Sequence, residues 1–174
     1  RRVAFTIIQD RERARYLAQD NGVDPDDFIL VPVSALGETY TNKTTYLQDR
    51  LGIPTNKFLV LSAGGIAHYN LCVELARHAQ DWPEDWVLVI HGYVPDPNYL
   101  DELRPYCTNG KVYLSTDLIP YQELDILMAS ADVGVALYKD MGPNFEHIVL
   151  SSGKLVQYLK VGLPVVATAF PGVR

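Results

Sequence analysis

Short apolar runs alternate along the chain with segments in which apolar residues recur every three or four positions. The runs are apolar throughout and end at turn-forming residues, which is typical of strands buried on both faces of a sheet. They predict strands at residues 3–8, 28–33, 58–63, 86–90, 112–114, 133–137 and 164–167.

The segments between these runs have the period of amphipathic helices. Asp10 is a suitable N-cap for the first helix, and Asn21-Gly22 is a suitable stop. Because helices and buried strands alternate, we predict an α/β fold: a Rossmann-like parallel sheet with helices on both faces. The helices are expected at residues 11–20, 69–80 and 98–106, and further ones near Thr44 or Thr45, Pro120 and Lys154.

The pattern divides the chain into three parts. Residues 1–34 form a β-α-β unit, residues 35–56 a polar linker with one short helix, and residues 57–174 a longer series of strands and helices. The chain starts with Arg rather than Met and begins directly on a predicted strand. We therefore expect a fragment of a longer protein.

Composition narrows the kinds of partner. The 174 residues are 48% hydrophobic and 21% charged, with a net charge of −6 and no block of like charge. This balance is typical of a globular protein and argues against nucleic acid or an anionic membrane as the main partner. Cys72 and Cys107 match no metal-ligand spacing. A cytoplasmic location fits these features, and a peripheral position at the inner membrane face is compatible with them.

The segment Ser151-Ser152-Gly153-Lys154 stands where a loop becomes a helix. Backbone N–H groups at a helix start are unpaired and the helix dipole is positive there, so the segment predicts an anion site, most naturally for phosphate. The same residues also fit a simple helix cap, with Ser151 or Ser152 as the N-cap and Lys154 in solvent. Both interpretations are open from the sequence.

Other candidates also follow predicted strands. Gly64-Gly65 either lets a phosphate approach the backbone closely or simply makes a tight turn. The four histidines are scattered, and His68 and His91 are the better functional candidates because they follow strands. The polar loop at residues 138–150 is either a binding loop or a variable surface loop.

Four motifs follow one another along the chain. They are Phe58-Leu-Val-Leu-Ser-Ala-Gly-Gly65, Val87-Leu-Val-Ile-His-Gly92, Ile119-Pro-Tyr-Gln-Glu-Leu-Asp-Ile-Leu-Met-Ala-Ser-Ala-Asp-Val133 and Lys154-Leu-Val-Gln-Tyr-Leu-Lys-Val-Gly-Leu-Pro-Val-Val-Ala-Thr168. Taken in this order, they resemble the retaining nucleotide-sugar glycosyltransferases of the GT-B fold, the "group 1" or family 4-like enzymes. The last motif is the most specific, and residues 3–33 also look like the final strand-helix-strand of the family's N-terminal acceptor domain.

The resemblance implies that residues 57–174 are most of a donor-binding domain that holds a nucleotide-diphosphate sugar without a metal or other cofactor. Main-chain groups of Leu118 and Ile119 would meet the base, and Gln157 would contact the ribose. The residues implied to bind the diphosphate are Gly64, Gly65, Ser151, Ser152, Gly153 and Lys154.

This chain departs from the family pattern at several positions. Gly65 replaces the family's Arg, and the family's Lys falls near Asn70. Val149 and Gln157 replace the two acids of the Glu-x7-Glu pair. Lys154 would supply a positive charge, as it does in family branches that carry Lys at this point.

The resemblance implies a parent enzyme that transfers a hexosyl group from a nucleotide sugar, with retention, to a glycan, lipid or small-molecule acceptor, for example in the building of a cell-surface polysaccharide. The cleft would need the missing remainder of the parent chain, so we expect this piece alone to be inactive. The departures also leave open a catalytically inactive relative that binds a nucleotide sugar or a partner protein. A nucleotide-sugar epimerase is a third option on the same fold.

Overall fold

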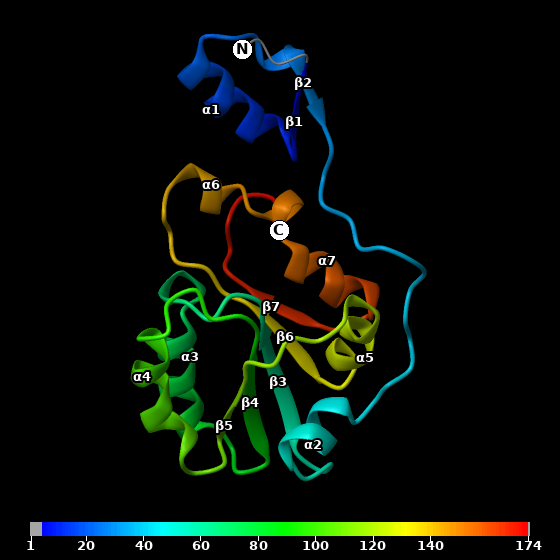
Figure 1. Ribbon diagram of the computed structural model, residues 1–174, viewed down its shortest axis with the longest axis vertical. Coiled ribbons are helices and arrows are strands. Elements are labelled where there is room, and N and C mark those ends of the chain that lie inside the picture. The colour runs from blue at the N-terminus through cyan, green and yellow to red at the C-terminus, as the bar shows by residue number, and fades with distance from the viewer. Residues whose placement is uncertain (1–4, 174) are drawn as a thin grey trace.

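A computed structural model of the chain describes residues 5–173 and contains two separate parallel sheets (Figure 1). The smaller sheet pairs β1 (Thr6–Ile8) with β2 (Phe28–Leu30), and α1 (Arg11–Asn21) connects them. The five-stranded sheet has the order β5-β4-β3-β6-β7. Both sheets are parallel, so the predicted α/β class is confirmed.

The strands of the larger sheet occupy the predicted apolar runs, and those of its centre are buried. The chain passes from the β3 position outward through β4 to β5, and then returns to the other side of β3 as β6 and β7. Ligands of such sheets bind beyond the carboxyl ends of the strands, at the point where the strand order reverses. The strands are β3 (Phe58–Ala63), β4 (Trp86–His91), β5 (Val112–Ser115), β6 (Val133–Ala136) and β7 (Val165–Ala167).

Helices cover both faces of this sheet (Figure 1). On one face α3 and α4 pack through Cys72, Ala76 and Leu103. On the other face α2, α5 and α7 pack through Leu47 and Leu127, among others. The helices are α2 (Tyr46–Leu51), α3 (Cys72–His78), α4 (Tyr99–Leu103), α5 (Leu124–Met128), α6 (Pro143–Glu146) and α7 (Gly153–Lys160).

Single turns of 3-10 helix extend or connect these helices. They begin or end several of the predicted helical segments, which is common because the tighter turn satisfies terminal backbone groups. The turns lie at η1 (Pro25–Asp27), η2 (His68–Asn70), η3 (Ala79–Asp81), η4 (Arg104–Cys107), η5 (Tyr121–Glu123) and η6 (Val149–Ser151).

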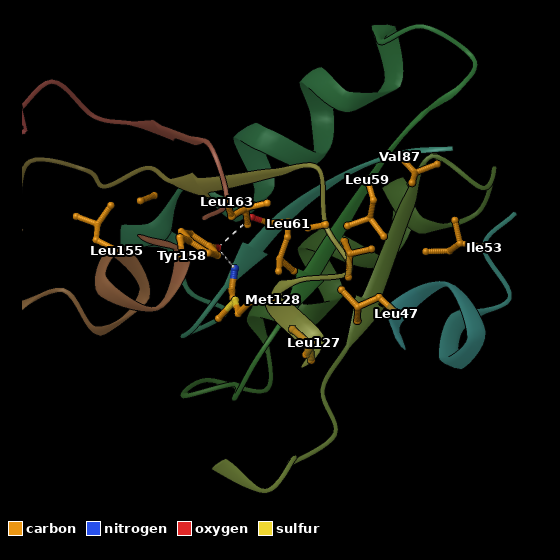
Figure 2. Packing of buried hydrophobic residues seen from close by; sticks show 14 of the residues in the cluster. Leu47, Ile53, Leu59, Leu61, Val87, Leu127, Met128, Leu155, Tyr158 and Leu163 are labelled. Atoms are coloured by element: carbon orange, nitrogen blue, oxygen red, sulfur yellow. Dashed lines mark hydrogen bonds between the residues drawn. The ribbon is translucent and has the colours of Figure 1, made fainter. Parts of the chain in front are cut away.

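Tyr158 attaches α7 to the centre of the sheet (Figure 2). Its side chain is fully buried, and its hydroxyl donates to the Leu61 carbonyl oxygen at 3.0 Å and accepts from the Ala63 N–H at 2.9 Å. The ring lies against Gly134 of β6, where an added Cβ would come within 2.8 Å of it. Tyr158 therefore ties α7 to β3 and packs it against β6.

Some predicted elements differ in extent. The helix expected at residues 69–80 starts only at Cys72, because Leu71 adopts a left-handed conformation with φ of 53° between η2 and α3. The strand expected at 28–33 ends at Leu30. The loop at 138–150 contains α6 and η6. Of the strand expected at residues 3–8, the first two residues lie outside the described part of the chain.

The small β1-α1-β2 unit contacts the larger one through α1 and α6. Asp10 caps α1, as predicted, and Gly22 ends it in a left-handed conformation. The guanidinium of Arg13 donates from Nε to the His147 carbonyl oxygen at 3.0 Å and from Nη2 to the Asn144 carbonyl oxygen. One arginine thus joins α1 to the segment around α6.

The connection between the two units, residues 31–45, has no helix or strand and runs along one side of the molecule (Figure 1). Its first part is tied to the larger unit, because the Val33 N–H donates to the Leu150 carbonyl oxygen at 2.8 Å. Within residues 5–173, no helix has the length and apolar character needed to cross a membrane.

Candidate functional site

A cavity of about 360 Å³ lies at the carboxyl ends of β3 and β4, beside the start of α7. This volume is within the range of small-molecule sites, and the location is the ligand edge of a parallel sheet. Residues from the connecting segment close one side of it. The lining residues are Val33, Ser34, Ala63, Gly64, His91, Gly92, Tyr93, Tyr121, Leu124, Met128, Gly153, Lys154, Val156 and Gln157.

The first turn of α7 brings polar groups to this cavity. Ser152 is the N-cap, and its Oγ accepts from the Leu155 N–H at 3.3 Å. The N–H groups of Gly153 and Lys154, the two residues between Ser152 and Leu155, have no hydrogen-bond partner among residues 5–173. Such groups carry the positive end of the helix dipole, so this edge of the cavity suits an anion.

Lys154 adds a full positive charge to the same edge. Its Nζ donates to the Asn70 Oδ1 at 3.2 Å and lies 4.9 Å from the centroid of the Tyr138 ring. Within the described chain, no carboxylate forms an ion pair with it. Burial lowers the pKa of Lys154 to about 8, because the ammonium loses water without gaining a counter-charge. An anion in the cavity would supply that counter-charge.

Gly64 and Gly92 form the floor of the cavity. Gly64 lies under Lys154, because a Cβ added to it would be 3.3 Å from the lysine Cε. Gly92, with φ of 150°, lies so close to the Gly64 carbonyl that an added Cβ would be 1.6 Å from its oxygen. The turns after β3 and β4 can therefore touch only as long as position 92 is glycine.

Gly65 does not line this cavity. A Cβ built there would lie 3.0 Å from the Tyr69 hydroxyl and 3.3 Å from the Tyr93 hydroxyl. The two tyrosines thus occupy the space that a side chain at position 65 would enter. A larger residue at position 65 would therefore require the Tyr69 and Tyr93 side chains to move.

His91 ends β4 and faces the cavity as a buried side chain. Its Nδ1 is hydrogen-bonded to the Ser115 Oγ at 2.9 Å. Burial lowers the pKa of His91, and the positive charge of Arg50 acts in the same direction. The imidazole is therefore neutral at pH 7 and contributes no charge to the site.

Gln157 lies one helical turn after Lys154 and is buried at the cavity wall. Its Nε2 donates to the Asp125 Oδ1 at 3.0 Å. The other oxygen of Asp125 accepts from the Lys160 Nζ at 2.5 Å, and Lys160 also donates to the Leu36 carbonyl oxygen at 2.5 Å. A hydrogen-bonded chain therefore connects the cavity wall, α5 and the connecting segment.

The structure brings four predicted site residues, Gly64, Gly153, Lys154 and Gln157, to one cavity. The hydroxyl groups of the predicted serines bond within the protein instead: Ser151 Oγ donates to the Ile148 carbonyl oxygen, and Ser152 Oγ bonds to the Tyr138 hydroxyl at 2.6 Å. Ser152 is thus the N-cap, but the cap interpretation was wrong in placing Lys154 in solvent, because Lys154 is partly buried against Asn70 and Tyr138. The free N–H groups beside Ser152 leave the anion interpretation open.

The remaining candidates lie outside the cavity lining. Leu118 is 90% exposed, and Ile119 packs against the core near α5. His68 is exposed in η2, and its ring meets the edge of Tyr69. His147 contacts the Tyr16 ring across the boundary between the two units. Whether any of these residues binds a ligand stays a prediction.

The sequence assigned no role at the site to three polar residues, although Asn70 was noted as lying near the family's Lys position. Asn70 is buried and bonds both the Gly65 carbonyl oxygen, at 2.6 Å, and Lys154. Asp125 and Lys160 hold Gln157 through the hydrogen-bonded chain. The one usable signal was the spacing of Gln157 and Lys160, three residues apart on one helix, since such residues share a face. No group of three or more His, Cys, Asp or Glu side chains in residues 5–173 is placed to hold a metal ion.

No protein-family model matches the chain, and no curated protein matches it. Solved structures do resemble it. Anabaena Alr3699/HepE, crystallised with UDP-glucose, aligns over 98% of this chain and 46% of its own, at 18% identity and a TM-score of 0.71. WaaG, a glycosyltransferase involved in lipopolysaccharide biosynthesis, aligns over 94% and 44% at 15% identity and a TM-score of 0.70.

Sucrose-phosphate synthase from Thermosynechococcus elongatus aligns over 99% of this chain and 42% of its own, at 16% identity and a TM-score of 0.66. The chain therefore has the fold of GT-B glycosyltransferases, as the motifs predicted, with the Rossmann-like sheet of their C-terminal domain. It spans less than half the length of these three proteins. Identities this low show a shared fold alone.

Proposed function

We propose that the chain is the donor-binding part of a glycosyltransferase, and that the cavity beside α7 holds a nucleotide-diphosphate sugar. The single observation that carries this proposal is Lys154: a partly buried ammonium with no counter-charge, next to two free N–H groups at a helix start. Fixed donors of this kind stabilise the negative charge that develops on a leaving diphosphate. HepE, which has the same fold, was crystallised with UDP and with UDP-glucose.

In this proposal Gly153 and Lys154 contact the diphosphate, and Gly64 lets it approach the backbone. Gln157 contacts the ribose, and main-chain groups near Leu118 and Ile119 meet the base. No metal is required, because the helix start and the lysine supply the positive charge. The small β1-α1-β2 unit would be the end of the acceptor domain, and transfer of a hexosyl group with retention would need the rest of a parent chain.

Titration calorimetry with UDP, GDP and ADP tests donor binding directly. We expect one of the three to bind, and Lys154→Ala to weaken that binding at least tenfold, since a charge-assisted hydrogen bond contributes about 1.5–3 kcal/mol. Lys139→Ala is the matched control, because Lys139 is an exposed lysine that does not line the cavity. Absence of binding by all three nucleotides at millimolar concentration would reject the proposal.

A catalytically inactive relative is the second candidate, and Gly65 favours it. With glycine at position 65, where the family pattern has Arg, no second basic side chain comes from this position, and the Tyr69 and Tyr93 hydroxyls lie beside it instead. Such a protein would bind the nucleotide but transfer no sugar. Hydrolysis or transfer of the sugar of UDP-glucose by a full-length parent, measured with and without Lys154→Ala, separates the two candidates.

A further inference from the structure

The hydrogen bond between Gln157 and Asp125 determines which way round the glutamine amide lies. An ionised carboxylate only accepts hydrogen bonds, so Gln157 must turn its NH2 group toward Asp125 Oδ1, 3.0 Å away. The other carboxylate oxygen of Asp125 forms an ion pair with the Lys160 Nζ at 2.5 Å. The amide therefore cannot flip without placing two acceptors against each other.

Because its NH2 group is bonded to Asp125, the carbonyl oxygen of Gln157 is the part of the amide that remains available to a ligand. It has no hydrogen-bond partner among residues 5–173, although the residue is only 4% exposed and lines the cavity. This oxygen is not one of the fully buried unpaired atoms of the described chain, so a donor of a ligand in the cavity can reach it and take the place of water there. The group that this position can recognise is therefore a donor, such as a hydroxyl, and not an acceptor.

The Asp125 carboxylate is held by Lys160, which is itself held by the connecting segment. Lys160 lies on the same helix as Gln157, and its side chain is only 9% exposed. It also donates to the Leu36 carbonyl oxygen, and the Tyr40 N–H donates to the Lys160 carbonyl oxygen at 3.2 Å. A charged pair enclosed in this way has little freedom to move, which preorganises the side chain that it holds.

We propose that Asp125, held by Lys160, is a positioning residue: it fixes Gln157 so that its carbonyl oxygen accepts a hydrogen bond from the pentose hydroxyls of a bound nucleotide. This inference rests on the proposed function of the cavity. It explains how the uncharged Gln157 side chain can recognise the two pentose hydroxyls. The negative charge is on Asp125, which is hydrogen-bonded to the Gln157 amide. Selectivity for ribose then depends on a residue that does not touch the ligand.

The test compares UDP, GDP and ADP with their 2′,3′-dideoxy analogues by titration calorimetry on the full 174-residue chain. The native protein should bind the preferred nucleotide at least tenfold more tightly than its dideoxy analogue. Asp125→Ala should reduce this ratio to below threefold while leaving the affinity for the dideoxy analogue within about twofold. Asp101→Ala is the matched control, because Asp101 of α4 forms only an exposed ion pair with Arg104, and it should keep the native ratio.

A swap variant, Gln157→Glu with Asp125→Asn, gives an independent check. The introduced amide can donate to one oxygen of the introduced carboxylate, which leaves the other oxygen facing the cavity. The preference for ribose should therefore be kept or increased. Should Asp125→Ala not fold, the swap variant alone decides: loss of the preference for ribose in a folded swap variant overturns the proposal.

The outcomes separate this inference from the proposed function. If no nucleotide binds the native protein, both are rejected. If a nucleotide binds and Asp125→Ala keeps the tenfold preference for ribose, only the positioning role is rejected. A purely structural role for Asp125 would lower the affinity for both members of each nucleotide pair equally and would leave their ratio unchanged.

Discussion

Gly92 lies directly on the Gly64 carbonyl group: a Cβ added to Gly92 would be 1.6 Å from that oxygen and 2.7 Å from the carbonyl carbon. This contact brings the turns after β3 and β4 together at the base of the cavity. It also places the Gly64 backbone under Lys154. A change at position 92 therefore affects both folding and the site.

We expect Gly92→Ala to destabilise the protein by about 3 kcal/mol or more, because backbone rather than a movable side chain blocks the new methyl group. Urea unfolding measures the change. Gly142→Ala is the control: Gly142 also has a positive φ, of 96°, but nothing lies within 4 Å of its added Cβ. That variant should lose only about 1 kcal/mol from backbone strain. Equal losses in the two variants would show that the contact with Gly64 is unimportant.

Tyr158→Phe removes the hydroxyl that joins α7 to β3. The Ala63 N–H and the Leu61 carbonyl oxygen would lose a buried partner, so we expect a loss of about 2 kcal/mol in the free energy of unfolding. Tyr16→Phe, at an exposed position on α1, should be neutral within about 0.5 kcal/mol. Unchanged stability of Tyr158→Phe would mean that apolar packing alone positions α7.

Lys154→Met should stabilise the ligand-free protein at neutral pH. The lysine pKa falls from 10.5 to about 8 on folding, so the unfolded chain binds the proton more strongly and the native stability rises with pH between these values. At pH 7 the variant should be more stable by about 1–3 kcal/mol, and its advantage should shrink toward pH 10. Urea unfolding at both pH values measures this, and an advantage that does not change with pH would contradict it.

Nucleotide binding should depend on the same proton. If the cavity holds a diphosphate, its affinity should fall as pH rises from 7 to 9, because the free Lys154 loses its charge near pH 8. Lys154→Arg keeps its charge throughout this range and should show no such decline. Calorimetric titration of the two proteins at pH 7 and 9 makes the comparison, and parallel declines would place the titrating group elsewhere.

Arg13→Ala should loosen the small β1-α1-β2 unit from α6. Two hydrogen bonds from one guanidinium to main-chain carbonyls are lost, so hydrogen exchange at residues 144–148 should become faster by about tenfold or more. Arg11→Ala, on the exposed side of the same helix, should leave exchange unchanged. Equal exchange in both variants would show that Arg13 does not couple the two units.

Features that depend on neighbouring residues in the chain were predictable from the sequence. Asp10 caps the start of α1 and Gly22 ends it, as expected, because capping groups and left-handed glycines act within one helical turn. The strand β3 and the start of α7 also lie where the apolar pattern and the small residues placed them.

Features that depend on tertiary contacts were not predictable. Leu71 takes a left-handed conformation that nothing in its local sequence requires, so the predicted long helix is divided there. Asp125 lies 32 residues from Gln157, and their hydrogen bond exists only because α5 and α7 pack on the same face of the sheet. The sequence singled out Gln157 but could not show that Asp125 is its hydrogen-bond partner.

Arg13 holds α6 by carbonyl oxygens alone, and every residue type carries a carbonyl oxygen. The side chains at positions 144 and 147 can therefore change over evolutionary time without loss of these two bonds. Substitutions at positions 144 and 147 should keep these hydrogen bonds, whereas a substitution of Arg13 removes both. The loop that carries α6 can therefore change these side chains while both hydrogen bonds from Arg13 are kept.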